Sequence, residues 1–330
     1  MMMLTCGSDI AISDYRHDGS RVYTRQASDA SRGERLDRWR LPARLAVRHN
    51  RSNPIRTHAA LLVALIGLGS LLGCAGSNRA PQPTTTPARP IELTVLTYNI
   101  HHAQGMDKRL DLQRIAGVIR ASGADLVALQ EVDNGTKRAG GVDQAAELAR
   151  LTNMHAVFGP AMSYDGGQYG NAVLSRWPIT SSRIVPLPWK QGNRREPRCA
   201  VSATTRLPHG AGPLEMISTH WDHTRNESNR EAQAHALNQA WADADERSIL
   251  AGDFNCELGS PPMETLGRAW TLVSGTDPAA LTCCGDRLRA KIDHVLVKPS
   301  DRWRVIEHRV IDEPVASDHR PVLVKLQWRR

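Results

Sequence analysis

Over most of this chain, short apolar runs rich in β-branched residues alternate with segments that have helical periodicity. The run IELTVLTYNI at 91–100 is typical of a β-strand, and so is DLVALQEV at 125–132. Between them, Leu112, Ile115 and Ile119 fall on one face of a helix. Further strands are expected at 170–179, 214–221, 248–255, 292–297 and 321–328, and further helices at 146–153 and 228–244.

This alternation predicts sandwiched β-sheets with helices outside them and a cleft at one rim, where strand ends meet. The chain has 330 residues, 41% of them hydrophobic, which is enough to bury a full core. No internal repeat is visible. We therefore expect a single α/β domain over 91–330.

The formal charge of +8 suggests nucleic-acid binding, but the excess lies outside the expected domain. Residues 1–90 hold 13 of the 42 Lys and Arg residues and 6 of the 34 Asp and Glu residues. The remaining 29 basic and 28 acidic residues lie in 91–330. The domain therefore has no general attraction to polyanions, which disfavours a processive nuclease.

An apolar run at 59–72, AALLVALIGLGSLL, is short for a bilayer span. Arg48, Arg51 and Arg56 precede it with no acidic residue among them, as in a signal peptide. The run ends in LLGC, which resembles the bacterial lipobox and indicates lipidation of Cys74. The alternatives are a buried apolar helix and an unprocessed membrane anchor.

The N-terminal part is therefore expected to be a leader at 1–46, a lipoprotein signal peptide at 47–73 and a Pro- and Thr-rich tether at 74–90. A lipoprotein signal normally starts a chain. The leader is then either a product of a start codon assigned upstream of Val47 or a disordered extension. The expected product is an exported, membrane-anchored lipoprotein of a bacterial cell envelope.

Six cysteines are compatible with export, but Cys6 lies in the leader and Cys74 at the lipidation position. Among the other four, Cys256, Cys283 and Cys284 can supply one disulfide. Their spacing matches no zinc motif, and the pairing stays open from the sequence alone.

Polar side chains end most of the β-like runs. One such residue is more often an ordinary solvated terminus than a ligand, but strands of one sheet bring their ends together. The set is Asn99, Glu131, His220, Asp253, Asn255, Asp293, Asp318 and His319.

The ordered motifs YNIHH, LQEV, GNAVLSRWPI, STHWDH, GDFN, IDHV and SDHRPV resemble the endonuclease/exonuclease/phosphatase superfamily over essentially all of 91–330. GDFN and SDHRPV are the most diagnostic pair. The resemblance implies a DNase-like four-layered α/β sandwich, in which two packed mixed β-sheets are flanked by helices. It also implies hydrolysis of phosphoester bonds.

The resemblance further implies a metal site with Mg²⁺ or Mn²⁺. Glu131 of LQEV matches the principal carboxylate ligand, with Asn99 of YNI beside it holding metal-bound water or phosphate. Asp318 of SDHRPV matches a second carboxylate on the metal side. Oxygen ligands of this kind suit a hard cation.

The other motif residues are implied to act on the phosphate. Asp253 of GDFN resembles the residue that orients or deprotonates the attacking water, and Asn255 the amide that holds a phosphate oxygen. His319 resembles the imidazole that contacts the scissile phosphate, with Asp293 fixing its tautomer. His220 resembles the histidine that helps the leaving oxygen depart.

Weaker candidates surround this set. Lys190, Arg194, Arg195 and Arg198 form a basic cluster that is either a solvated loop or a clamp for a substrate phosphate. Histidines beside the motifs are as readily rim residues as catalytic ones, and the tryptophans either line the cleft or pack. These residues are His101, His102, His223, Trp189 and Trp221.

We therefore expect a monomeric, metal-dependent phosphodiesterase. Its substrate is nucleic acid, a phospholipid head group or a small phosphodiester, so a membrane-tethered nuclease and a sphingomyelinase-like lipid phosphodiesterase both fit. The alternative from another class is a non-catalytic surface binding module of the same fold, in which the acidic residues are structural.

Overall fold

The computed structural model describes residues 90–189, 196–208, 211–243, 247–285 and 287–329. The chain divides into two units, 1–78 and 79–330, and the described residues belong to the second. The expected leader, signal peptide, lipidated cysteine and tether up to residue 89 lie outside the described residues, as do Lys190, Arg194 and Arg195. No helix in the described ranges is long and apolar enough to cross a membrane.

Two mixed sheets of six strands each pack face to face. In the first sheet β1 and β2 run parallel, and the other neighbours are antiparallel. Its strands in spatial order are β11 (Trp303–Val310), β12 (Val322–Trp328), β1 (Ile91–Asn99), β2 (Leu126–Asn134), β4 (Gly167–Ser175) and β3 (His155–Tyr164).

The second sheet has the same plan, with β7 and β8 as its parallel pair. Its strands in spatial order are β5 (Ile179–Leu187), β6 (Arg198–Leu207), β7 (Gly212–His220), β8 (Arg247–Asp253), β10 (Asp293–Lys298) and β9 (Thr271–Leu272). Each parallel pair therefore requires a crossover, which α1 makes in the first sheet and α3 in the second.

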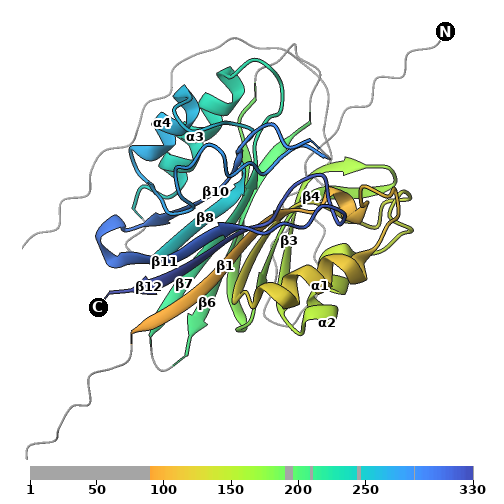
Figure 1. Cartoon of the computed structure of the whole chain (residues 1–330), viewed down its shortest axis with the longest axis horizontal. Helices are drawn as coiled ribbons and strands as arrows, with labels where there is room; N and C mark the ends of the chain where they lie inside the picture. The colour runs from red at the N-terminus through yellow and green to blue at the C-terminus, as the bar shows by residue number, and fades with distance from the viewer. Residues whose placement is uncertain (1–89, 190–195, 209–210, 244–246, 286, 330) are drawn as a thin grey trace, which may run out of the picture. The chain divides into compact units, whose positions relative to one another are not determined.

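Helices cover the outer faces of the sandwich (Figure 1). α1 (Leu112–Ser122) and α2 (Gln144–Thr152) pack on the first sheet, and α3 (Ser228–Ala240) and α4 (Pro261–Gly267) on the second. Two single 3₁₀ turns, η1 (His101–Ala103) and η2 (Ser300–Arg302), complete the regular structure of the described residues.

The core has three layers because the central strands are buried on both faces. On β1, Leu93 and Val95 lie in the core between the sheets, whereas Leu96 and Tyr98 pack under α1 and α2. This two-residue alternation explains why the strands read as almost continuous apolar runs. The expected α/β sandwich with two helix-covered sheets is confirmed.

Several element boundaries differ from the sequence prediction. The run at 170–179 is not one strand, because β4 ends at Ser175 and β5 begins at Ile179, after Pro178. The helix expected at 228–244 ends at Ala240. The strands β3, β6, β9 and β11 and the helix α4 have no counterpart in the prediction.

The disulfide joins the adjacent residues Cys283 and Cys284. Cys256 and Cys199 are buried free thiols. Of the pairings left open by the sequence, the structure therefore contains the one within the CC dipeptide.

Candidate active site

The inward-facing side-chain rows of four strands end in polar residues at one rim of the sandwich. They are Asn99 on β1, His220 on β7, Asp253 on β8 and Asp293 on β10. In the second sheet, Asp253 is the register partner of both His220 and Asp293. Because side chains of paired residues project from the same face of a sheet, these three groups converge.

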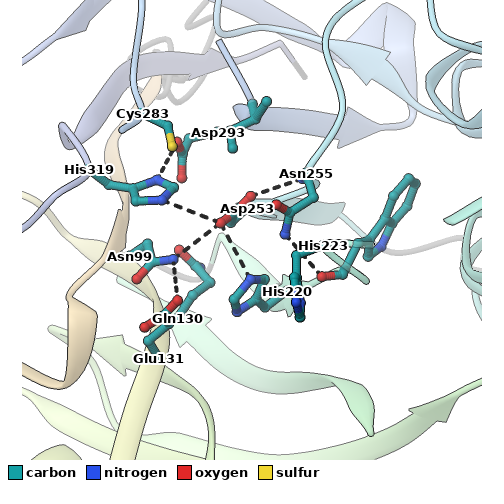
Figure 2. A network of polar contacts seen from close by, with 12 residues as sticks. Asn99, Gln130, Glu131, His220, His223, Asp253, Asn255, Cys283, Asp293 and His319 are labelled. Atoms are coloured by element: carbon teal, nitrogen blue, oxygen red, sulfur yellow. Dashed lines mark hydrogen bonds and ion pairs between the residues drawn. The ribbon is translucent and has the colours of Figure 1, made fainter. Parts of the chain in front are cut away.

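Asp253 is the centre of the resulting polar network (Figure 2). Its Oδ2 atom accepts a hydrogen bond from Asn99 Nδ2 at 3.1 Å and lies 3.4 Å from His220 Nε2 and 3.7 Å from His319 Nε2. Its Oδ1 atom accepts from the backbone N–H of Asn255 at 2.9 Å. One carboxylate therefore contacts four of the sequence-predicted site residues.

The environment of Asp253 changes its acidity. The side chain is 2% exposed, and burial, followed by the charge of Asp293, raises the pKa of its carboxyl to about 7. The nearby imidazole of His319 opposes this shift. Asp253 can therefore exchange a proton near neutral pH.

His319 and Asp293 form a buried dyad. His319 Nδ1 lies 2.9 Å from Asp293 Oδ2, and both residues are at most 6% exposed. Burial lowers the pKa of His319, but the carboxylates of Asp293 and Asp253 outweigh it and raise that pKa to about 10. The imidazolium is therefore held between two carboxylates at neutral pH.

Glu131 lies in a β-bulge near the end of β2, where the pairing with β4 shifts between Leu129 and Val132. Its backbone has a φ of 58°, a conformation that residues other than glycine rarely adopt. Such backbone is concentrated at functional sites, because the surrounding structure must hold it in place. The bulge turns the carboxylate toward Asn99, whose Nδ2 donates to Glu131 Oε1 at 3.2 Å.

Asn99, Glu131 and Asp318 offer the donors that a divalent cation requires. Within the described residues, Glu131 accepts a hydrogen bond from Asn99 and forms no ion pair with a cationic side chain. Asp318 is half-buried, and its Oδ1 lies 3.9 Å from His101 Nδ1. The partly buried Glu131 carboxylate, which has no cationic partner among the described residues, fits a hard divalent cation, although Asn99 faces it through Nδ2 and not through its amide oxygen.

The sequence profile of the Endonuclease/Exonuclease/phosphatase family matches residues 96–319, which contain every site residue described in this subsection. The chain belongs to this family. The predicted membership is confirmed, and it places the protein among phosphoester hydrolases.

Several solved structures have a similar fold. An endonuclease/exonuclease/phosphatase from Beutenbergia cavernae is 26% identical, over 73% of this chain and 72% of its own, with a TM-score of 0.57. A mannosyl-6-phosphatase from Bacteroides thetaiotaomicron is 19% identical, covering 71% and 99%, with a TM-score of 0.55. ANGEL2, a 2′,3′-cyclic phosphatase, is 14% identical, covering 72% and 95%, with a TM-score of 0.57.

The family motif GDFN begins with a residue that must be glycine here. A Cβ atom on Gly252 would overlap the carbonyl oxygen of Thr219 on the parallel neighbour β7. The close approach of β7 and β8 sets the spacing between His220 and Asp253. In the same motif Asn255 has a φ of 49°, and its Nδ2 donates to the carbonyl of Trp221 at 3.1 Å.

Arg198 is the one member of the expected basic cluster that lies in the described part of the chain. It is 4% exposed, and its guanidinium contacts His220 Nδ1 and His223 Nδ1, each at 3.0 Å. Burial, followed by the charge of Arg198, holds the pKa of His220 well below its usual range. His220 is therefore neutral, with Nδ1 as an acceptor and the Nε2 proton directed toward Asp253.

The remaining tryptophan and histidine candidates differ in their positions. Trp221 is fully buried and packs edge-on against Phe254 with centroids 4.8 Å apart, so it belongs to the core. Trp189 is 49% exposed after the end of β5. His101 and His102 follow β1 after Ile100 and lie beside Glu131.

Three supporting residues were absent from the sequence prediction. Ser317 Oγ donates to the carbonyl of Asn99 at 2.8 Å and accepts from the N–H of His319 at 3.2 Å, which joins β1 to the SDHRPV loop. Thr282 Oγ1 accepts from the N–H of Asp293 at 3.3 Å. Gln144 of α2 donates to the carbonyl of His102 at 2.7 Å. Ser317 lies inside a diagnostic motif and was within reach of sequence reasoning, whereas nothing in the sequence marks the other two.

Proposed function

We propose that this protein is a divalent-metal-dependent phosphodiesterase, in which water attacks phosphorus with the assistance of Asp253 and His319. The observation that carries the proposal is the buried chain from Asp293 through His319 to Asp253, next to the Glu131 carboxylate. A binding module needs no such chain. Burying ionisable groups costs free energy, and groups with strongly shifted pKa values are concentrated at catalytic sites.

Asn99, Glu131 and Asp318 are the residues that would hold the cation. A bound divalent cation supplies positive charge that polarises a phosphoryl oxygen and stabilises charge as it develops. Asn99 also donates a hydrogen bond to both Glu131 and Asp253. It therefore fixes the carboxylate that would hold the cation relative to the carboxylate that would orient the attacking water.

Asp253 is assigned to orient the attacking water and accept its proton. A general base is most effective when its pKa lies near the working pH, and the pKa of Asp253 is raised to about 7. The N–H of Asn255 and the amide of Asn99 hold one oxygen each. The carboxylate therefore keeps one orientation as the proton moves.

His319 is assigned to meet the developing negative charge on the phosphate. Its pKa is raised to about 10, so the ring enters the reaction protonated and can donate from Nε2. Asp293 holds Nδ1 and acts as a positioning residue. The sequence assigned His220 to the leaving oxygen, but its Nε2–H faces Asp253 and its Nδ1 faces Arg198, so we assign it to orienting Asp253.

A phosphodiester is favoured over a phosphomonoester by the charge of the site. Glu131, Asp253 and Asp293 gather there, with Asp318 next to His101, and a monoester dianion meets more repulsion from these carboxylates than a singly charged diester. The relatives of this fold include a cyclic phosphatase, which supports a diester, and a mannosyl-6-phosphatase, which supports a monoester. The expected lipid anchor at Cys74 makes envelope lipids and extracellular DNA the substrates within reach.

A substrate panel tests the proposal. The purified protein with Mg²⁺, and separately with Mn²⁺, is assayed on bis-p-nitrophenyl phosphate, p-nitrophenyl phosphate, plasmid DNA and sphingomyelin vesicles. We expect the diester to be cleaved faster than the monoester, and Asp253→Asn to abolish most of both activities. Faster cleavage of the monoester would contradict the diesterase assignment, and no cleavage of any substrate would contradict the enzyme.

A further inference from the structure

The chain leaves β1 through a turn with an unusual backbone. His101, His102 and Ala103 all have positive φ, at 46°, 43° and 64°. Residues other than glycine rarely adopt this conformation singly, and here three do so in succession. Two side-chain contacts hold the turn: Asn99 Oδ1 accepts from the N–H of His101 at 3.1 Å, and Gln144 donates to the carbonyl of His102 at 2.7 Å.

The turn brings two imidazoles together beside Glu131. The ring centroids of His101 and His102 are 4.6 Å apart, with the rings edge-on. One nitrogen of each ring and one carboxylate oxygen of Glu131 lie within 4.8 Å of one another. Three potential ligand atoms thus surround one point at the metal side of the active site.

His101 has the hydrogen bond that is typical of a metal-binding histidine. Its Nδ1 lies 3.0 Å from the carbonyl oxygen of Gln104, so Nδ1 carries the proton and donates it. Nε2 is then left with a free lone pair. Histidine ligands in proteins almost always direct their other N–H to a carbonyl or carboxylate in this way.

His102 supplies an independent indication. The residue is 8% exposed, and its Nδ1 is buried with no hydrogen-bond partner. Buried polar atoms are almost always partnered, and one that is not indicates a further partner such as a bound ion. A carboxylate oxygen of Glu131 lies within 4.8 Å of a ring nitrogen of His102 in the same cluster.

We propose that His101, His102 and Glu131 form a nitrogen-rich position for a first-row transition-metal cation, for which Mn²⁺ is the spectroscopic probe. Imidazole ligands favour such cations over Mg²⁺, which takes oxygen ligands and dehydrates reluctantly. The inference rests on the proposed metal-dependent function, because Glu131 is also a ligand of the oxygen-rich position formed with Asn99 and Asp318. It adds two ligands from YNIHH, to which the resemblance assigns no metal role, and a metal preference.

Pulsed electron paramagnetic resonance of the metal-free protein with one equivalent of Mn²⁺ tests the proposal without reference to activity. We expect a ¹⁴N modulation from coordinated imidazole in the wild type. His101→Asn/His102→Asn should remove this modulation and weaken Mn²⁺ binding at least ~10-fold, while Mg²⁺ binding changes less than ~2-fold. Asparagine is chosen because it tolerates positive φ. The control is His155→Asn, an exposed residue at the start of β3, which should change neither result.

The outcomes separate this inference from the proposed function. A nitrogen-free Mn²⁺ spectrum in the wild type, or equal Mn²⁺ affinity in the double variant, overturns the inference even if phosphodiesters are cleaved. Nitrogen coordination without any phosphoester hydrolysis overturns the proposed function alone. If the double variant does not fold, the anomalous map of a Mn²⁺-soaked wild-type crystal decides. A peak bonded to His102 and Glu131 supports the site, and one bonded only to Asn99 and Asp318 contradicts it.

Discussion

His319 Nδ1 lies 2.9 Å from Asp293 Oδ2, and this contact fixes which way the imidazole acts. Because Nδ1 donates to the carboxylate, Nε2 points to Asp253, 3.7 Å away. Asp293 also raises the pKa of Asp253 through its charge, but its carboxylate bonds to His319, so we expect its main influence on the reaction to pass through the histidine.

This relationship predicts non-additive kinetics. His319→Ala and Asp253→Asn should each lower kcat by roughly 10²–10⁴-fold, the usual scale for acid–base groups. Asp293→Asn/His319→Ala should be little worse than His319→Ala alone, because residues that act as a unit lose their effect together. The measurement is kcat on bis-p-nitrophenyl phosphate for Asp293→Asn, for His319→Ala and for the double variant. Fully multiplicative losses would show that Asp293 works independently of His319.

A second prediction concerns the spacing of β7 and β8. Gly252→Ala should lower the free energy of unfolding by several kcal/mol, because the added Cβ overlaps the carbonyl oxygen of Thr219. The matched control is Gly117→Ala in α1, where nothing lies within 4 Å of the added Cβ. That change should stabilise the protein by roughly 0.5–1 kcal/mol through helix propensity. Urea unfolding measures both, and equal effects of the two substitutions would refute this explanation of the motif.

A third prediction is acid destabilisation through His294. This buried residue on β10 contacts the carbonyl oxygen of Cys256 through Nε2, and its Nδ1 has no partner. Burial lowers the pKa of His294 from 6.5 to about 4. Between these values the unfolded state binds the proton and the folded state does not, so the stability present above pH 6.5 is lost as the pH falls.

The contribution of His294 at pH 5 is on the order of 2 kcal/mol. His294→Gln can keep the bond to Cys256 but cannot ionise. Between pH 7.5 and pH 5, the free energy of unfolding, measured with urea, should therefore fall by about 2 kcal/mol less in the variant than in the wild type. The same pH dependence in both proteins would mean that His294 is not the group responsible.

A fourth prediction concerns the N-terminal region. The LLGC motif and its flanks predict that the mature protein begins at a lipidated Cys74 and partitions with membranes. Cys74→Ser should release or mislocalise the protein, whereas Cys6→Ser in the leader should have no effect. Labelled fatty acid that never enters the wild-type protein would disprove the anchor.

Much of the site was predictable from the sequence because strand alternation has a fixed period. On β1 the inward row runs through Leu93 and Val95 to Asn99, so the motif residue could be assigned to a strand end. On β8, Ile249 and Ala251 lead to Asp253 in the same way. The convergence of these ends at one rim follows from the parallel pairs that each sheet contains.

Other features depend on partners distant in the sequence and could not be predicted. The bulge at Glu131 exists only in the pairing of β2 with β4. β11 was missed because six consecutive residues after Trp303 are exposed, which gives an edge strand no alternating pattern. β6 was missed because polar residues such as Ser202 are buried in it. The contact at His220 Nδ1 likewise depends on Arg198, which the sequence indicated only as part of a basic loop.

The central claim is that a cation held at Glu131 is required for phosphodiester hydrolysis. It is tested most directly by the rate of bis-p-nitrophenyl phosphate cleavage before EDTA treatment, after it, and after Mg²⁺ or Mn²⁺ is restored, in the wild type and in Glu131→Gln. The account predicts that wild-type activity vanishes in chelator and returns with either metal, and that Glu131→Gln stays at least ~100-fold less active at the same metal concentration. Undiminished hydrolysis in EDTA, or wild-type rates in Glu131→Gln, would contradict it.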